Sequence, residues 1–385
     1  MGLLESLSSM HKNKALVIPY GSVPAKTYLP DGDLDIAVIF LTDGGNRKKN
    51  SSFNQSRQEA SETQQTMTFY QSLKSLEKVR DNSELYGHKI SNVQFIKAKI
   101  NLITLRVDDY KIDISFKKHM GMCKFILFEE IDNEFSSLVQ QSEAHIVKNY
   151  VILVKAWFTY EARAVGGNKG FFSSYSLEIL VVHVLNIFWK EISTPGCFLK
   201  KFFEYFSSFP WKTHMITLYS APSKDATKIR HKQLGRLPIS PKKVESWLSR
   251  NSIRLPGKNK FLFGCICVQD PLNHSNNVSV TINSNTFERV QKVFQQGHAK
   301  MEKLLSKDYS GVEDPVAYCK KELFPCTQWV LDRCKELERE HYRKIFPDED
   351  VEINVDTSDI LSGNVQQLSW YVKQFKLFPP QGPRF

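Results

Sequence analysis

The chain has 385 residues, 52 Lys and Arg against 41 Asp and Glu, and a formal net charge of +11 at pH 7. Its 41% hydrophobic and 24% charged residues are those of a globular protein long enough for two or three domains. No uncharged apolar run approaches the roughly 18 residues of a membrane span, and the N-terminus lacks the features of a signal peptide. We therefore expect a nuclear or cytoplasmic protein that is neither secreted nor membrane-bound.

The cysteines exclude two further classes of protein. There are seven, an odd number, and no Cys-x-x-Cys pair occurs. This pattern predicts reduced thiols rather than a disulfide scaffold or a zinc site.

The N-terminal part of the chain favours a sheet-rich domain. Short apolar runs bounded by turns predict strands over residues 15–20, 33–40, 93–107 and 110–116. Residues 42–64 are polar, which indicates a surface insertion. The segment 66–79 carries Phe69, Leu73 and Leu76 at helical spacing, so it predicts a helix.

From about residue 141 the pattern becomes helical. Helices are expected within residues 144–162, 173–192, 239–252 and 284–305, and a charged one over 315–345 with a break at Pro325. We place a domain boundary near residue 140. This predicts a domain over 1–140, a helical domain over 141–310 and an extension of unknown role over 311–385.

Positive charge is concentrated in one tract of the helical domain. Residues 224–260 hold eleven Lys and Arg but only two acidic residues, an excess of nine positive charges. Such an excess predicts contact with a polyanion, in competition with the simpler interpretation of a solvated loop. We predict that RNA phosphates are bound by Lys242, Lys243, Arg250 and Arg254.

Three aspartates carry the chemistry of the first domain. Asp33 and Asp35 are two residues apart at the entrance of a strand, so their side chains project to the same side. Asp113 lies in a second apolar strand that can run beside the first. Ionised carboxylates this close repel unless a cation lies between them, so the three predict a site for two Mg²⁺ or Mn²⁺ ions.

A phosphate-binding element is expected just before these aspartates. Gly21 and Ser22 follow the first strand and should open a helix, whose backbone N–H groups could bind phosphates together with the serine hydroxyl. A lone Gly-Ser or Asp-x-Asp pair is weak, and the latter could be a simple turn. The ordered set of strand, Gly-Ser, Asp-x-Asp and a later strand-borne aspartate is far more specific.

The sequence resembles the DNA polymerase beta-type nucleotidyltransferases, and within them the plant poly(A) polymerase and oligoadenylate synthetase-like proteins. The resemblance rests on "PYGSVPAKTYLPDGDLDIAV", "KIDISF", "LFEEID", "LVKAWFTYEARAVGG", "GFFSSYSLEILVVHVLNIF" and "VQDPLNHSNNVSV", and it covers residues 15–305 in the expected order. It implies an α+β fold, in which a mixed-sheet nucleotidyltransferase domain is followed by a mainly helical PAP/OAS-type substrate-binding domain.

The resemblance also implies roles for individual residues. The metal carboxylates would be Asp33, Asp35 and Asp113, and the nucleotide would be bound by Gly21, Ser22, Lys155, Ser174, Tyr175 and Asn276. Lys155 would contact the triphosphate, Ser174 a phosphate, and Tyr175 would stack on the base. Each of the three also has a purely structural interpretation. Lys155 could be a snorkelling lysine, Ser174 a helix N-cap and Tyr175 a core aromatic residue.

The chain departs from its relatives at two places that affect the nucleotide. Lys117 and Lys118 stand where relatives often carry Asn or Gln, and the segment 276–280 lacks an arginine that is common there. Asn276 stands where uridylate-adding relatives often carry histidine. Because an asparagine amide can pair with adenine, we expect ATP to be favoured over UTP.

The sequence thus predicts a template-independent, Mg²⁺-dependent nucleotidyltransferase that adds nucleotides to RNA 3′ ends. One alternative is an RNA-binding protein that kept the fold and lost turnover, which the two lysines, the missing arginine and a short N-terminus favour. The other is an enzyme that makes short nucleotide messengers.

Overall fold

The computed structural model describes residues 15–40, 64, 66–75, 84–85, 88–97, 101–108, 110–116, 119–138, 145–225, 237–251, 253 and 260–345. Within them the chain forms two compact units, unit 1 up to Ile126 and unit 2 from Leu127 onward. The division falls inside helix α3 (His119–Leu138), whose residues belong to one continuous helix. All but one residue of the polar insertion 42–64 lie outside the described residues, as do Lys117 and Lys118.

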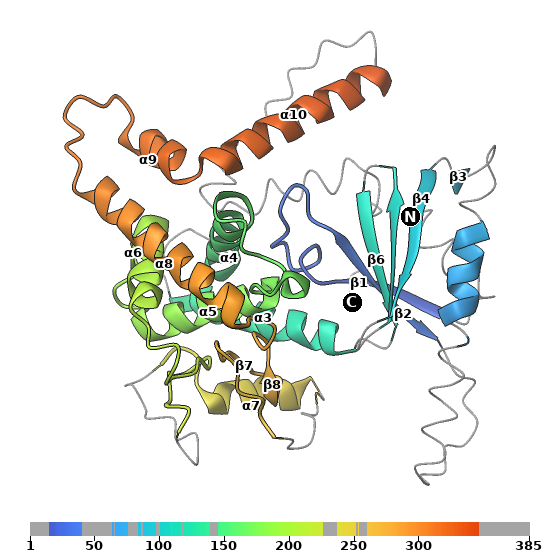
Figure 1. The fold of residues 1–385 in the computed structure, drawn as a ribbon, viewed down its shortest axis with the longest axis horizontal. Helices are drawn as coiled ribbons and strands as arrows, with labels where there is room; N and C mark the ends of the chain where they lie inside the picture. The colour runs from blue at the N-terminus through green and yellow to red at the C-terminus, as the bar shows by residue number, and fades with distance from the viewer. Residues whose placement is uncertain are drawn as a thin grey trace. The chain divides into compact units, whose positions relative to one another are not determined.

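Unit 1 is built on a mixed sheet, as the sequence predicts. Its strands, drawn from blue to cyan in Figure 1, are β1 (Ala15–Tyr20), β2 (Leu34–Phe40), β3 (Glu84–Leu85), β4 (His88–Ile96), β5 (Leu102–Val107) and β6 (Tyr110–Phe116). Their order is β1-β2-β6-β5-β4-β3. Strands β2 and β6 pair in parallel, and the other neighbours in this order pair antiparallel.

One predicted strand is two strands in the structure. Residues 93–107 contain the end of β4 and all of β5, which pair antiparallel with Phe95 opposite Ile103. The prediction of a single run was wrong because both strands continue the same apolar alternation and neither Gly nor Pro marks the turn between them.

The core of unit 1 lies between the sheet and the helix at residues 66–75. Phe69 and Leu73 of this helix are fully buried, as their spacing predicts, and Phe69 packs edge-on against Phe116. Ile36 and Ile114 of the sheet belong to the same hydrophobic cluster as Phe69 and Leu73. Leu76 lies outside the described residues.

Unit 2 consists mainly of helices. They are α4 (Ile146–Ala156), η1 (Trp157–Glu161), η2 (Gly167–Lys169), α5 (Ser174–Phe188), α6 (Pro195–Ser207), α7 (Pro241–Arg250), α8 (Ser284–Leu305), α9 (Pro315–Leu323) and α10 (Pro325–Ile345), with a small hairpin of β7 (Gln269–Asp270) and β8 (Asn273–Asn277). Several of these helices begin at an N-cap residue whose side chain accepts a hydrogen bond from a backbone N–H of the first turn. The N-cap residues are Ser173, Thr194, Ser240, Asn283 and Asp314. A mainly helical second part is therefore confirmed.

Aromatic side chains fill the core of unit 2. Phe172, Phe206 and Trp211 pack around Phe294 with ring centroids 5.2–6.1 Å apart. Helices α6 and α8 pack closely at Gly297, because a Cβ atom there would lie 2.3 Å from the ring of Phe203. Glycine thus allows the two helices to approach this closely.

The C-terminal helices α9 and α10 are anchored to unit 2. The Glu161 carboxylate, at the end of η1, accepts from Cys326 N at 3.2 Å, Thr327 N at 2.8 Å and Thr327 Oγ1 at 2.9 Å. It therefore caps the N-terminus of α10, where a negative charge is favourable. Phe324 and Trp157 pack edge-on beside this cap, so residues 315–331 belong to the unit rather than to a separate tail.

Two of the exclusions drawn from composition can be compared with the structure. All seven cysteines are free thiols. Among the described helices, none combines the length and the apolar character that crossing a membrane requires.

Candidate active site

Strand pairing places the three predicted carboxylates of unit 1, which we call the acidic trio (Asp33, Asp35 and Asp113). Asp35 in β2 is the parallel partner of Asp113 in β6, and Asp33 lies just before β2. Because alternate residues share a face of a strand, Asp33 and Asp35 project to the same side. The main-chain register thus brings two acidic side chains together at one place in the sheet.

A lysine lies among these carboxylates. Lys111 Nζ is 2.5 Å from Asp33 Oδ2 and 3.6 Å from Asp113 Oδ2. Partial burial lowers the pKa of Lys111, but hydrogen bonds and charge attraction from Asp33 and Asp113 outweigh it and raise the pKa above its ordinary value. Lys111 was not among the predicted site residues, although its position two residues before Asp113 places it on the same face of β6.

The donors of the acidic trio fit a divalent cation in chemistry. Carboxylate oxygens are the ligands that Mg²⁺ and Mn²⁺ prefer. Asp113 Oδ1 is buried and has no hydrogen-bond partner among the described residues, which leaves it an oxygen for a cation to bind. Within the described ranges, however, no three His, Cys, Asp or Glu side chains already converge as a metal-holding group, and the space between Asp33 and Asp113 holds the Lys111 ammonium.

The Gly21-Ser22 segment is a loop rather than the start of a helix. Residues 21–26 form turns, in which Thr27 N donates to Ser22 O at 2.9 Å and Lys26 N to Val23 O at 3.0 Å. The predicted helix was wrong because Gly21 and Lys26 both have positive φ, +76° and +55°, which no right-handed helix contains. A Cβ at Gly21 would lie 2.4 Å from Asp35 Oδ2, so this glycine lets the loop pass directly against the acidic trio.

In unit 2, the predicted nucleotide residues lie at the ends of α4 and α5. Lys155 is in the last turn of α4 and is 5% exposed, so it is no snorkelling surface lysine. The N-cap of α5 is Ser173, whose Oγ accepts from Ser176 N at 3.1 Å. Ser174 is the first residue of the helix and is exposed, so the alternative interpretation of Ser174 as the N-cap is wrong.

Tyr175 and Asn276 are joined by a buried carboxylate, and we call Tyr175, Asp270 and Asn276 the polar network. Tyr175 Oη donates to Asp270 Oδ1 at 2.8 Å, and Asn276 Nδ2 donates to Asp270 Oδ2 at 3.1 Å. The backbone N–H of Leu272 donates a third hydrogen bond to this carboxylate, also at Oδ1. Burial, and then the charge of Asp270, raises the pKa of Tyr175 well above its ordinary value, so the phenol stays a donor.

Asp270 is the residue of this network that was not among the predicted site residues. It lies in the quoted motif "VQDPLNHSNNVSV", six residues before Asn276, and it is 3% exposed. Its place in a conspicuous motif was a signal. Its two side-chain partners, however, are Tyr175, 95 residues before it, and Asn276, six residues after it. Local sequence patterns do not show that these side chains converge on Asp270.

Part of the predicted RNA-binding tract is already paired with acidic side chains of α3. Lys243 on α7 contacts Glu134, and Arg250 Nη2 lies 3.3 Å from Glu130 Oε2. Lys242 is exposed at the first turn of α7, and Arg254 lies outside the described residues. The tract is therefore partly neutralised within unit 2.

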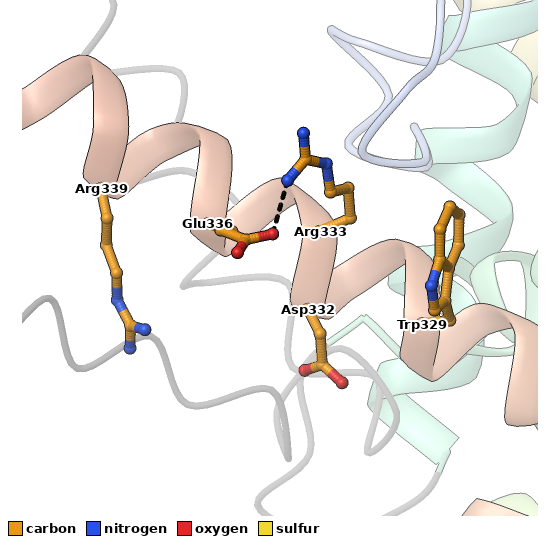
Figure 2. Close-up of a pocket in the computed structure, with 5 residues that line it drawn as sticks. All are labelled: Trp329, Asp332, Arg333, Glu336 and Arg339. Atoms are coloured by element: carbon orange, nitrogen blue, oxygen red, sulfur yellow. Dashed lines mark hydrogen bonds and ion pairs between the residues drawn. The ribbon is translucent and has the colours of Figure 1, made fainter.

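The described residues also form a shallow hollow of about 290 Å³ along α10. Trp329, Asp332, Arg333, Glu336 and Arg339 line it on successive turns, and Arg333 Nη1 pairs with Glu336 Oε2 at 2.5 Å (Figure 2). Among the described residues that line this hollow, none is a predicted site residue.

Comparison with protein families matches both parts of the chain. Residues 1–133 match the nucleotidyltransferase domain, and residues 141–319 match the PAP/OAS1 substrate-binding domain. These matches confirm the resemblance, the α+β fold class and the prediction of a nucleotidyltransferase enzyme. The comparison with curated proteins found no match.

Solved structures of low sequence identity share the fold. The crystal structure of Cid1 poly(U) polymerase is similar with a TM-score of 0.50 and 16% identity, over 84% of this chain and 90% of that one. Its complex with a UTP analogue gives the same four values. A variant of that enzyme bound to MgATP has a TM-score of 0.50 and 17% identity over the same shares. At this identity the comparison establishes the fold.

Proposed function

Because this chain belongs to the PAP/OAS-like nucleotidyltransferases, we propose that it adds nucleotides to RNA 3′ ends without a template. The observation that carries the proposal is the parallel register of Asp35 with Asp113, with Asp33 two residues before Asp35. This gives the nucleotidyltransferase domain a set of carboxylates at one place in its sheet. The fold shared with Cid1 poly(U) polymerase supports an RNA 3′ end as the acceptor.

In this proposal each residue has a defined task. The acidic trio would hold divalent cations, two Mg²⁺ or Mn²⁺ ions, whose chemistry is to lower the pKa of the attacking hydroxyl and to stabilise the leaving oxygen. The Gly21 loop lies against Asp35 and has no Cβ in the way, so its N–H groups and the Ser22 hydroxyl can orient phosphates beside the carboxylates.

The residues of unit 2 would bind the nucleotide. Lys155 and Ser174 would contact phosphates, and the Tyr175 ring would stack on the base. The polar network supports this task, because the bond from Tyr175 Oη to Asp270 fixes the direction of the ring.

We propose that ATP is preferred over UTP. Asn276 is held by the bond from its Nδ2 to Asp270. An asparagine amide offers both a donor and an acceptor, as pairing with adenine requires. The substitution Asn276→His should shift incorporation towards UTP, and an unchanged ATP to UTP ratio would refute this role.

The experiment is primer extension on labelled oligo(A) with each of the four nucleotides and with Mg²⁺ or Mn²⁺. We expect elongated products with ATP, and none from the Asp33→Ala variant under the same conditions. Short oligonucleotides made without the primer would instead indicate a nucleotide-messenger synthetase.

A second candidate is an RNA-binding protein of the same fold without turnover. The specific observation in its favour is the Lys111 ammonium between Asp33 and Asp113, which occupies space that a catalytic cation needs. Primer binding without any incorporation, in Mg²⁺ and in Mn²⁺, would select this candidate.

A further inference from the structure

Lys111 holds a position that has no role in nucleotide transfer as proposed above. It lies two residues before Asp113 in β6, and its ammonium reaches both Asp33 and Asp113, 2.5 Å and 3.6 Å from one oxygen of each. Lys111 thus bridges an aspartate of β6 and an aspartate at the entrance of β2.

The ammonium and a divalent cation compete for the same two carboxylates. Two carboxylates that share a site repel each other, and any cation between them relieves the repulsion. Lysine has no acceptor and cannot bind a metal ion, so it cannot remain between Asp33 and Asp113 when such an ion binds both. One of the two cations must leave.

We propose that Lys111 is a tethered counter-ion that a divalent cation must displace from the acidic trio. The lysine neutralises the carboxylates when no metal is bound, and it weakens the affinity of the site for the metal. The proposal rests on the proposed function only in taking these aspartates as metal ligands.

The exposure of the pair favours a displaceable partner over a structural one. The Lys111 and Asp33 side chains are 45% and 40% exposed. Exposed ion pairs contribute little to folding stability, and a long lysine side chain can swing into water without opening the core. The removal of this charge should therefore change metal binding much more than it changes folding.

The test is Mn²⁺ binding by the full chain, measured by electron paramagnetic resonance at fixed ionic strength without nucleotide or RNA. The variant Lys111→Met keeps an unbranched side chain, one atom shorter, and removes the charge. We expect it to bind Mn²⁺ about tenfold more tightly than the wild type, because the repulsion between the two cations is removed. Lys111→Arg keeps the charge and should bind like the wild type.

Lys89→Met is the matched control, since it removes the same charge from an exposed lysine of β4 in the same sheet. We expect its Mn²⁺ affinity to stay within about twofold of the wild type, because distant exposed charges are screened. Thermal unfolding of each variant checks that it is folded.

The outcomes separate this proposal from the proposed function. If Asp33→Ala loses Mn²⁺ while Lys111→Met binds it no more tightly than the wild type, the metal ligands stand and the displacement is refuted. If Asp33→Ala binds Mn²⁺ as the wild type does, the acidic trio is not the metal site and both proposals fail.

Discussion

The two units hold polar side chains in opposite ways. In unit 1, Asp33 and Asp113 lie 40% and 17% exposed and share the ammonium of Lys111 as a counter-ion. In unit 2, Asp270 is 3% exposed and is held by three hydrogen bonds, from Tyr175, Leu272 and Asn276.

This difference in exposure decides whether a carboxylate can exchange its partner for another one. A carboxylate near water can give up an ammonium for another cation at little cost. A buried carboxylate that loses a donor has no water to replace it, so the loss destabilises the fold. Substitutions of Asp33 or Lys111 should therefore affect chemistry with little effect on folding, and substitutions in the interior of unit 2 should affect folding first.

The largest expected effect is on catalysis through unit 1. Asp33→Ala should reduce nucleotide incorporation by at least about 1,000-fold, or about 4 kcal/mol in the activation barrier, because the substitution removes a proposed metal ligand. The free energy of unfolding should change by no more than about 0.5 kcal/mol, as for other surface substitutions. Primer extension and urea denaturation measure the two. A fully active variant would remove Asp33 from the active site.

Low pH should lower the folding stability of unit 2 through a buried histidine. His183 is fully buried, its Nδ1 donates to Thr217 O and its Nε2 accepts from Tyr205 Oη, and burial lowers its pKa from 6.5 to about 4. Between pH 4 and pH 6.5 the unfolded chain binds a proton on His183 that the folded chain does not bind. The contribution of His183 to the free energy of unfolding is therefore complete above pH 6.5, and it is lost as the pH falls to about 4. It amounts to about 3 kcal/mol.

The measurement is urea denaturation at pH 7, 6, 5 and 4 for the wild type and for His183→Gln, which cannot titrate. The wild type should lose about 3 kcal/mol more than the variant over this range. Equal losses would show that other groups account for the acid sensitivity.

Close helix packing in unit 2 gives the next effect. Gly297→Ala would place a methyl group 2.3 Å from the buried ring of Phe203. Overpacking of this kind costs about 1–3 kcal/mol of stability. Gly311→Ala is the matched control, because no atom of the described residues lies within 4 Å of its added Cβ. Thermal unfolding should separate the two variants, while both keep the wild-type turnover at temperatures where they are folded.

The smallest effect concerns the basic tract. Neutralisation of Lys242, Lys243, Arg250 and Arg254 should reduce the salt slope of RNA binding by about 0.7 for each phosphate that the protein no longer neutralises. Because Glu134 and Glu130 compete with phosphates for Lys243 and Arg250, exposed Lys242 should contribute more than either. Salt titrations of oligo(A) binding measure the slope, and ATP affinity should stay unchanged. An unaltered slope would leave the tract a solvated surface.

Sequence reasoning succeeded where local patterns determine structure. The two-residue period of a strand placed Asp33 and Asp35 on one side, and helical spacing identified Phe69 and Leu73 as core residues. The motif order led to a fold class that the structure and the family matches confirm. The assignment of roles to individual site residues remains a prediction.

The missed features depend on contacts between distant segments. Asp270 Oδ1 accepts from Tyr175 on α5, 95 residues away, and no pattern near Asp270 in the sequence indicates that contact. The loop after β1 carries apolar and turn residues that suit a helix start, but the positive φ values of Gly21 and Lys26 exclude one. Helix α3 was not predicted because its apolar residues are not gathered on one face.

The cap of α10 by Glu161 has a consequence for synthesis of the chain. The two partners are 166 residues apart, so the bond between Glu161 and Thr327 forms only after Thr327 has been made. At about 5–20 residues per second, translation of that interval takes on the order of ten seconds. During this time Trp157 on the nascent chain lacks the Phe324 ring that packs against it in the finished protein. Until residue 324 has been made, Trp157 on the growing polypeptide can pack against Phe203 but lacks its second aromatic neighbour.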